Sequence, residues 1–268
     1  ILLGQVSIIF LGVFRPSAET GIYKIYFSII AIIQLGLISL ASIYKPVISE
    51  YISQENFGEL KNIYNRISKW YIAITFLSFI VILFLGKSIV STLFTRAYVV
   101  APLALVILAT THLMNALTGP DGMTLEAFGN TKLIMLNISL MLLVNVGLNY
   151  LLVPSYGIIG AAIATATATA AGHLAGLLEV YKLHGLQPFS FIYIKYFAAA
   201  TVSALVYYPI SIIIPSSSMI SILGSLIFLV GIYIGIVYLV GGLDDTDFAI
   251  LRHLKKRLLQ ALPDKNGA

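Results

Sequence analysis

The sequence predicts an all-α protein that crosses a membrane several times. Of its 268 residues, 59% are hydrophobic and only 10% are charged, whereas a soluble domain carries about 25% charged residues. Apolar runs of about 20 residues recur along the chain, and a helix of that length spans a hydrocarbon core of ~30 Å. The alternation of apolar and polar residues typical of membrane barrels is missing. The predicted fold is therefore a polytopic transmembrane helix bundle.

Eight spans are expected. Their approximate bounds are residues 1–14, 22–44, 70–85, 98–117, 133–153, 158–181, 193–214 and 219–240. A polar connection, residues 45–69, follows the second span. The first run reaches only about 21 Å as a helix, which is too short to span a membrane unaided. We therefore expect this chain to be a fragment cut within or just before that helix.

Lysine and arginine gather at alternate joints. Twelve of the sixteen lie after the second, fourth and sixth spans or in the tail, and cytoplasmic loops carry such an excess. We therefore expect a multi-pass protein of the cell membrane whose C-terminus is cytoplasmic. Residues 1–243 would form the bundle and residues 244–268 a cytoplasmic amphipathic tail. The tail fits either a helix lying on anionic headgroups or a solvated segment that satisfies the charge bias.

The sixth span carries a small residue at every fourth position. These residues are Gly160, Ala164, Ala168, Gly172 and Gly176. Such a stripe lets a neighbouring helix approach closely, which is the main packing device between helices in lipid. We expect this face to be buried against other helices.

Polar side chains on the fourth, fifth and sixth spans form the candidate site. The candidate residues are His112, Asn115, Asn145, Asn149, Thr165, Thr169 and His173. Polar groups at membrane depth are costly and usually face a bundle interior or a wet cavity. One interpretation is a hydrophilic cavity for a polar cargo, and the other is hydrogen bonding between helices. Packing is favoured for any single Thr or Asn and for His173, and the cavity for His112 with Asn115.

Charged side chains near the span ends allow two interpretations. Arg15 and Lys24 can extend to the interface, or they can form a cationic rim that contacts phosphates or acidic sugars. Asp121 and Glu126 lie in a turn and are expected to be solvated. Glu179 is expected to pair with a nearby residue of its own helix.

Motifs of enzymes and metal sites are missing from the sequence. It has no cysteine, no zinc-protease or nucleophile-elbow motif and no phosphate-binding loop. We therefore expect neither an enzyme nor a cofactor or metal site. The net charge of +5 is interpreted from the positions of the basic residues at the joints between spans, and it does not indicate nucleic-acid binding.

Two segments resemble the C-terminal region of polysaccharide-biosynthesis flippases. They read LTGPDGMTLEAFGNTKL (residues 117–133) and NVGLNYLLVPSYGIIGAAIATATA (residues 145–168). Residues 44–64 and 241–257 are similar to further parts of the same family. Its superfamily also includes lipid II flippases and multidrug and toxin extrusion antiporters. The shared pattern comprises Gly129, Asn130, Thr131, Lys132, Asn145, Asn149, Pro154, Gly157, Gly160, Ala161 and Ala162.

The resemblance implies a two-lobe transporter of about fourteen helices that works by alternating access. This chain would be the second lobe with two extra helices, and the N-terminal lobe would be missing. The implied cargo is a saccharide linked through phosphate to a polyprenol, moved from the inner to the outer leaflet. The implied partners are this lipid-linked saccharide, membrane lipids and the missing lobe. Relatives hold the phosphates with cavity arginines, for which only Arg15 and Lys24 are available near the first two spans.

Three other functions remain open at this point. An ion-coupled drug antiporter of the same superfamily would need a carboxylate at mid-membrane. A membrane-embedded lipid-sugar transferase would need an acidic or metal-binding loop, for which only residues 119–132 are available. A structural bundle without transport would leave the polar residues as packing alone.

Overall fold

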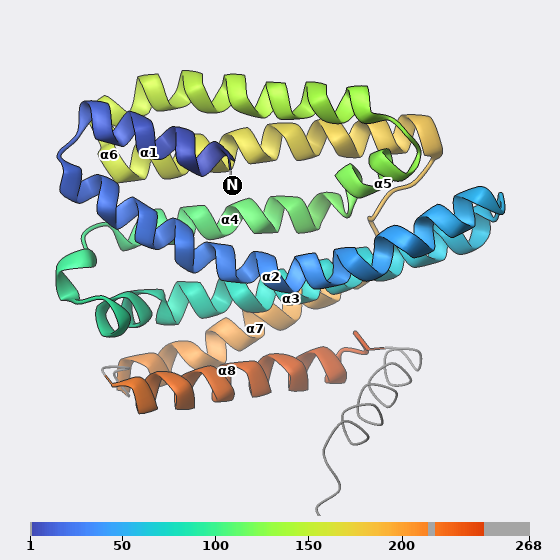
Figure 1. Ribbon diagram of the computed structural model, residues 1–268. Coiled ribbons are helices and arrows are strands. Elements are labelled where there is room, and N and C mark those ends of the chain that lie inside the picture. Colours follow the sequence, from blue (N-terminus) through green and yellow to red (C-terminus); the bar gives the residue numbers. More distant parts are fainter. Residues whose placement is uncertain (1, 214–217, 244–268) are drawn as a thin grey trace, which may run out of the picture.

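The computed structural model describes residues 2–213 and 218–243, and within these ranges every regular element is a helix (Figure 1). The helices are α1 (Leu2–Phe14), α2 (Ser17–Ser53), α3 (Phe57–Leu93), the 3-10 turn η1 (Arg96–Tyr98), α4 (Pro102–Thr118), α5 (Asp121–Ala127), α6 (Thr131–His184), α7 (Phe191–Ile213) and α8 (Met219–Leu239). The amphipathic tail expected for residues 244–268 lies outside the described residues.

Five helices are long and apolar enough to cross a membrane: α2, α3, α6, α7 and α8. The number rises to six if α4 and α5, which are bent by 47° relative to each other, count as one span. The first helix is apolar but only 13 residues long. These helices confirm the predicted membrane bundle. The count of five or six is lower than the eight expected spans mainly because α6 is counted once but contains two of them.

The 54-residue helix α6 is a hairpin that contains two expected spans. It turns at Gly157, whose backbone has φ 51° and ψ −128°, a conformation that glycine adopts without strain. Residues 131–156 form its first arm and residues 158–184 its second, and the two lie side by side (Figure 1). Asn137 on the first arm donates a hydrogen bond to Glu179 on the second at 2.6 Å. The expected local pairing of Glu179 is therefore wrong, because its partner is 42 residues away.

The helices α2 and α3 are each 37 residues long, or about 55 Å at ~1.5 Å per residue. Both exceed the ~30 Å of a hydrocarbon core, so their paired ends extend beyond the rest of the bundle (Figure 1). The connection expected at residues 45–69 is therefore mostly helical, with a break only at residues 54–56. Asn56 starts α3 by accepting a hydrogen bond from the backbone N–H of Glu59.

The stripe of small residues on α6 is buried, as the spacing predicts. A side chain at Gly160 would meet Leu152, and one at Gly172 would meet Met141. Both neighbours belong to the first arm, so the two arms pack closely because these positions lack side chains.

Buried tyrosines join the helices in a way that the apolar pattern does not reveal. The phenol of Tyr26 donates to the carbonyl of Tyr98 at 2.9 Å, and that of Tyr233 to the carbonyl of Ala73 at 3.0 Å. Tyr44 shares a 2.8 Å hydrogen bond with Thr124 of α5. Each phenol therefore buries its ring among apolar side chains while its hydroxyl bonds to another element.

Candidate functional site

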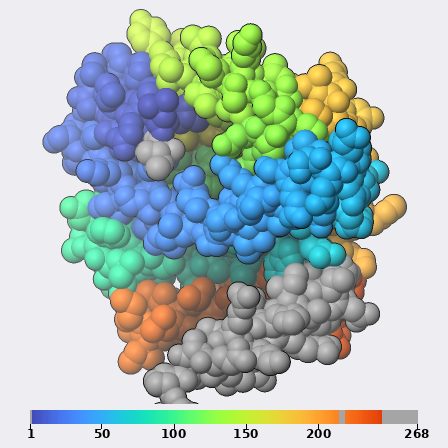
Figure 2. Space-filling model, turned by 45° about the vertical axis from the view of Figure 1, so that its right-hand side comes forward, coloured from blue at the N-terminus to red at the C-terminus, as the bar shows by residue number. Residues whose placement is uncertain are grey.

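A cavity of about 370 Å³ lies between α1, α2, α4 and both arms of α6. It opens on the face shown in Figure 2, where a hollow lies between α1, α2 and the first arm of α6. The hairpin at Gly157 brings both arms of α6 to the cavity. The helix α4 lines it with side chains from residues 108–115. The volume is within the range of small-molecule sites.

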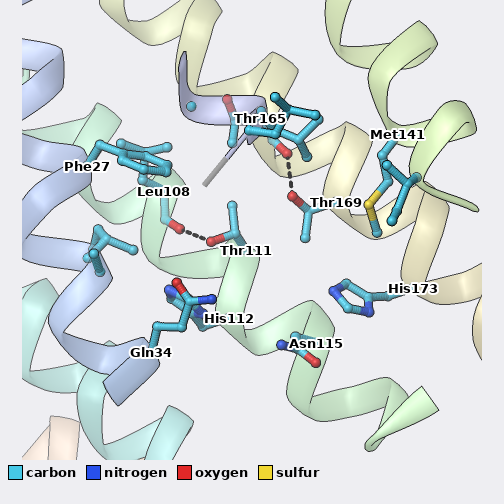
Figure 3. Close-up of a pocket in the computed structure, with 16 residues that line it drawn as sticks. Phe27, Gln34, Leu108, Thr111, His112, Asn115, Met141, Thr165, Thr169 and His173 are labelled. Atoms are coloured by element: carbon cyan, nitrogen blue, oxygen red, sulfur yellow. Dashed lines mark hydrogen bonds between the residues drawn. The ribbon is translucent and has the colours of Figure 1, made fainter. Parts of the chain in front are cut away.

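The polar part of the lining consists of side chains from α4 and the second arm of α6, together with Gln34 of α2 (Figure 3). The polar lining residues are Gln34, Thr111, His112, Asn115, Thr165, Thr169 and His173. Five of the seven candidate residues therefore lie around one space, namely His112, Asn115, Thr165, Thr169 and His173. Gln34 and Thr111 were missed, although a glutamine in the middle of the second span is itself a signal of a polar interior.

The rest of the lining is apolar. Its side chains include Phe27 and Ile30 of α2, Leu108 of α4, and Ile138 and Met141 on the first arm of α6. Phe27 and Met141 lie on different sides of the polar residues (Figure 3), so the cavity presents both polar and apolar side chains to the same occupant.

The polar side chains differ in which hydrogen bonds they can still form with an occupant of the cavity. Thr111 donates to the carbonyl of Leu108 at 2.6 Å, and Thr169 donates to the carbonyl of Thr165 at 2.8 Å. Both hydroxyls can then only accept from an occupant. The amides of Gln34 and Asn115 make no hydrogen bond within the described residues, so each can both donate and accept.

Asn145 and Asn149 lie outside the cavity lining, contrary to the expectation for a cavity site. Both are fully buried, in a junction where α1 and α2 meet α6. Asn149 donates to the hydroxyl of Ser7 at 3.0 Å, and Ser7 and Tyr23 each share a 2.9 Å hydrogen bond with Thr165. The amide of Asn149 therefore makes the hydrogen bond between helices that the packing interpretation expects, whereas the amide of Asn145 makes none. Thr165 belongs to both the junction and the cavity edge.

The junction is not fully satisfied within the described residues. Both amide atoms of Asn145 and the carbonyl oxygen of Asn149 are buried without a protein partner. Unpaired buried polar atoms are costly, and a buried water is the usual partner for such groups.

Asp121 and His173 form a pair at the other end of the cavity. The two carboxylate oxygens of Asp121 lie 3.1 and 3.2 Å from Nδ1 of His173. Asp121 is buried, with 5% of its surface exposed, so the expectation of a solvated Asp121 is wrong. The short helix α5 turns it inward, whereas Glu126 on the same helix is exposed as expected and forms an ion pair with Lys45 at 2.7 Å.

Arg15 and Lys24 do not line the cavity. Arg15 forms an ion pair with Glu19 at 2.9 Å and lies against the α6 turn, where its Nη1 is 3.5 Å from the carbonyl of Pro154. Lys24 is exposed on α2. A phosphate contact by either residue stays a prediction.

Metal ligands do not gather anywhere in the described part of the chain, where no group of three or more histidine and acidic side chains could hold an ion. Among those residues, the chemistry at the cavity is therefore that of amides, hydroxyls and two histidines.

A curated protein with a detectable similarity supplies a functional context. The chain is 25% identical over 186 residues to the probable low-salt glycan biosynthesis flippase Agl15 of Haloferax volcanii. The alignment covers 69% of this chain and 38% of that protein. No protein-family model matches the chain, and no solved structure matches it.

The fold and this similarity agree. The chain is a multi-pass membrane protein that resembles a glycan-biosynthesis flippase, and the likeness favours a transporter over an enzyme.

Proposed function

We propose that this chain is the C-terminal lobe of a flippase that moves a polyprenyl-phosphate-linked saccharide from the inner to the outer leaflet by alternating access. The observation that carries the proposal is the mixed lining of the cavity, which combines amides, hydroxyls and imidazoles with apolar side chains. A lipid-linked saccharide needs both kinds of side chain at once. The similarity to Agl15, named as a glycan biosynthesis flippase, supports this cargo class.

The polar side chains of the lining suit sugar hydroxyls, each of which donates one hydrogen bond and accepts others. The amides of Gln34 and Asn115 can serve both directions, while Thr111 and Thr169 accept. His112 adds an imidazole on the same turn of α4 as Asn115. The apolar side chains of the lining, such as Phe27 and Met141, suit the first units of the prenyl chain.

The open face of the cavity is where we place a second lobe. The aligned relative is much longer, since the alignment covers only 38% of it. A second bundle against this face would close the hollow seen in Figure 2, and rocking of one lobe against the other would expose the cavity to either leaflet in turn. In this arrangement the C-terminus is cytoplasmic.

The test is flipping of a fluorescent polyprenyl-phosphate disaccharide by the natural full-length protein in proteoliposomes. Asn115→Leu should reduce the initial rate about tenfold, because loss of a buried hydrogen bond costs about 1–2 kcal/mol. Thr169→Val should reduce it a few-fold.

Thr201→Val is the matched control for Thr169→Val. Thr201 is exposed on α7 and donates to the carbonyl of Phe197 at 2.9 Å, the same local bond as Thr169 but away from the cavity. The control should flip at the natural rate. Equal rates for Asn115→Leu and the control would contradict the assignment of the cavity.

A second candidate, the ion-coupled drug antiporter, is favoured by one observation. Asp121 is a buried carboxylate beside the cavity, which is what such an antiporter requires. In the same liposomes, uptake of a cationic dye that depends on an ion gradient and is lost in Asp121→Asn, without saccharide flipping, would select this alternative.

A further inference from the structure

The Asp121–His173 pair is placed at the end of the cavity, inside the bundle. The side chain of Asp121 is 7% exposed and that of His173 is 19% exposed. A buried carboxylate is costly unless a hydrogen-bonded or charged group faces it. The imidazole N–H of His173 is that partner, so each group depends on the other.

A glycine makes room for this contact. A side chain at Gly176, one turn after His173 on α6, would collide with Oδ2 of Asp121. The 47° bend between α4 and α5 then turns Asp121 towards this bare part of α6. Two independent features of the fold therefore bring the carboxylate to the ring.

The carboxylate determines where His173 can take up a proton. Asp121 accepts from Nδ1 and so holds the ring in the tautomer whose Nε2 carries a lone pair. Nε2 makes no hydrogen bond within the described residues, and the ring lines the cavity (Figure 3). Proton uptake at Nε2 converts the ring to imidazolium, whose charge Asp121 balances.

The other titratable groups around the pair are neutral phenols, a second histidine or residues that have partners of their own. Tyr64 and Tyr71 on α3 lie within electrostatic range of Asp121, and His112 on α4 within range of His173. The remaining groups are Tyr44, bonded to Thr124, Glu126, paired with Lys45, and Glu179, bonded to Asn137. An anionic occupant of the cavity would therefore act mainly on His173 and His112.

We propose that Asp121 and His173 form a proton-binding site at the end of the cavity, and that an anionic phosphate in the cavity increases its proton occupancy. The inference rests on the proposed function for the occupant, while the proton site rests on the pair itself. Because coupling between two ligands is reciprocal, protonation should in turn tighten phosphate binding. The site would hold the anion through an imidazolium, while the candidate phosphate contact Arg15 is paired with Glu19.

The experiment measures proton uptake when a prenyl phosphate binds. The natural full-length protein, in phospholipid nanodiscs and weak buffer with a pH-sensitive dye, is titrated with farnesyl phosphate and with the neutral alcohol farnesol. We expect proton uptake with the phosphate only, and a phosphate affinity that falls as the pH rises, by up to about tenfold per pH unit for one linked proton.

Variants separate the protein's proton from that of the phosphate, which itself titrates near about pH 6. His173→Gln and Asp121→Asn should bind with less uptake than the natural protein. His184→Asn, which removes a histidine outside the cavity, should show the same proton uptake on binding as the natural protein.

Each outcome decides between the two proposals. Binding with equal uptake in the natural protein and His173→Gln would overturn the proton site and leave the flippase proposal standing. If farnesyl phosphate does not bind, the flippase proposal loses its support. The imidazole nitrogen resonances of His173 then test the site alone. A dependence of these resonances on pH that changes in Asp121→Asn supports the site, and resonances that do not respond to pH overturn it.

Discussion

The amide of Asn149 donates to the hydroxyl of Ser7 at 3.0 Å, and this hydrogen bond ties the short helix α1 to the first arm of α6, about two turns before Gly157. Thr165 on the second arm contacts the same hydroxyl at 2.9 Å. Three helical segments therefore meet at one buried serine, next to the cavity-lining residue Thr165.

Replacing Asn149 with leucine should weaken this junction. The change leaves the shape similar but removes the amide, so the buried hydroxyl of Ser7 loses a donor. We expect a loss of about 1–2 kcal/mol in the free energy of unfolding, measured by thermal denaturation in detergent. Ser139→Ala is the control, because Ser139 is exposed on the same arm and bonds only to the carbonyl of Met135. Equal stabilities would show that the bond does not hold α1 in place.

The spans and the hairpin could be predicted from the sequence because their signals are local. Apolar length marks each helix, and the short turn around Pro154 and Gly157 predicts the reversal that α6 shows. The inward position of Asp121 could not be predicted in this way. It depends on Gly176, which is 55 residues later in the chain, and on the bend before α5. The local sequence around Asp121 indicates a turn but does not indicate that the carboxylate is buried.

The candidate site was predicted in part for the same reason. Helical spacing places His112 beside Asn115, and Thr165, Thr169 and His173 along one face, and these five residues do line the cavity. Spacing alone does not show which face of the first arm meets α1, so it could not separate the buried junction at Asn145 and Asn149 from the cavity.

Alanine at Gly157 should destabilise the hairpin of α6. The backbone there has φ 51° and ψ −128°, a region that costs other residues about 1–3 kcal/mol. A methyl group would also meet the carboxylate of Glu19 and the guanidinium of Arg15. We expect a loss of about 2 kcal/mol or more, measured by thermal denaturation.

Gly147→Ala provides the matched control for that substitution. Gly147 lies in the same helix, and a methyl group there meets nothing within 4 Å. Alanine has the higher helix propensity, by up to about 1 kcal/mol, so this variant should be unchanged or more stable. Equal destabilisation by the two substitutions would argue against the reversal at Gly157.

The ring of Phe128 stacks on His184 with a centroid separation of 3.6 Å and an interplanar angle of 10°. This stack joins the end of α5 to the last residue of α6, at the end of the hairpin opposite the Gly157 turn. Phe128→Ala should cost about 1–2 kcal/mol of unfolding free energy, since an aromatic pair adds to the burial of its area. Phe57→Ala serves as the control because Phe57 is 59% exposed. Comparable losses in the two variants would show that the stack adds nothing.

The distribution of lysine and arginine predicts which ends of the bundle face the cytoplasm. The α2–α3 turn and the α6 turn lie at opposite ends (Figure 1), and the chain has no cysteine of its own. A single cysteine placed at Ser49, exposed near the first turn, or at Ser155, exposed at the second, can therefore be labelled with a membrane-impermeant maleimide. By the positive-inside rule, Ser155→Cys should react in intact cells, and Ser49→Cys only after the membrane is opened. Labelling of Ser49→Cys in intact cells, and of Ser155→Cys only after the membrane is opened, would place the C-terminus outside. It would also contradict the proposed direction of transport.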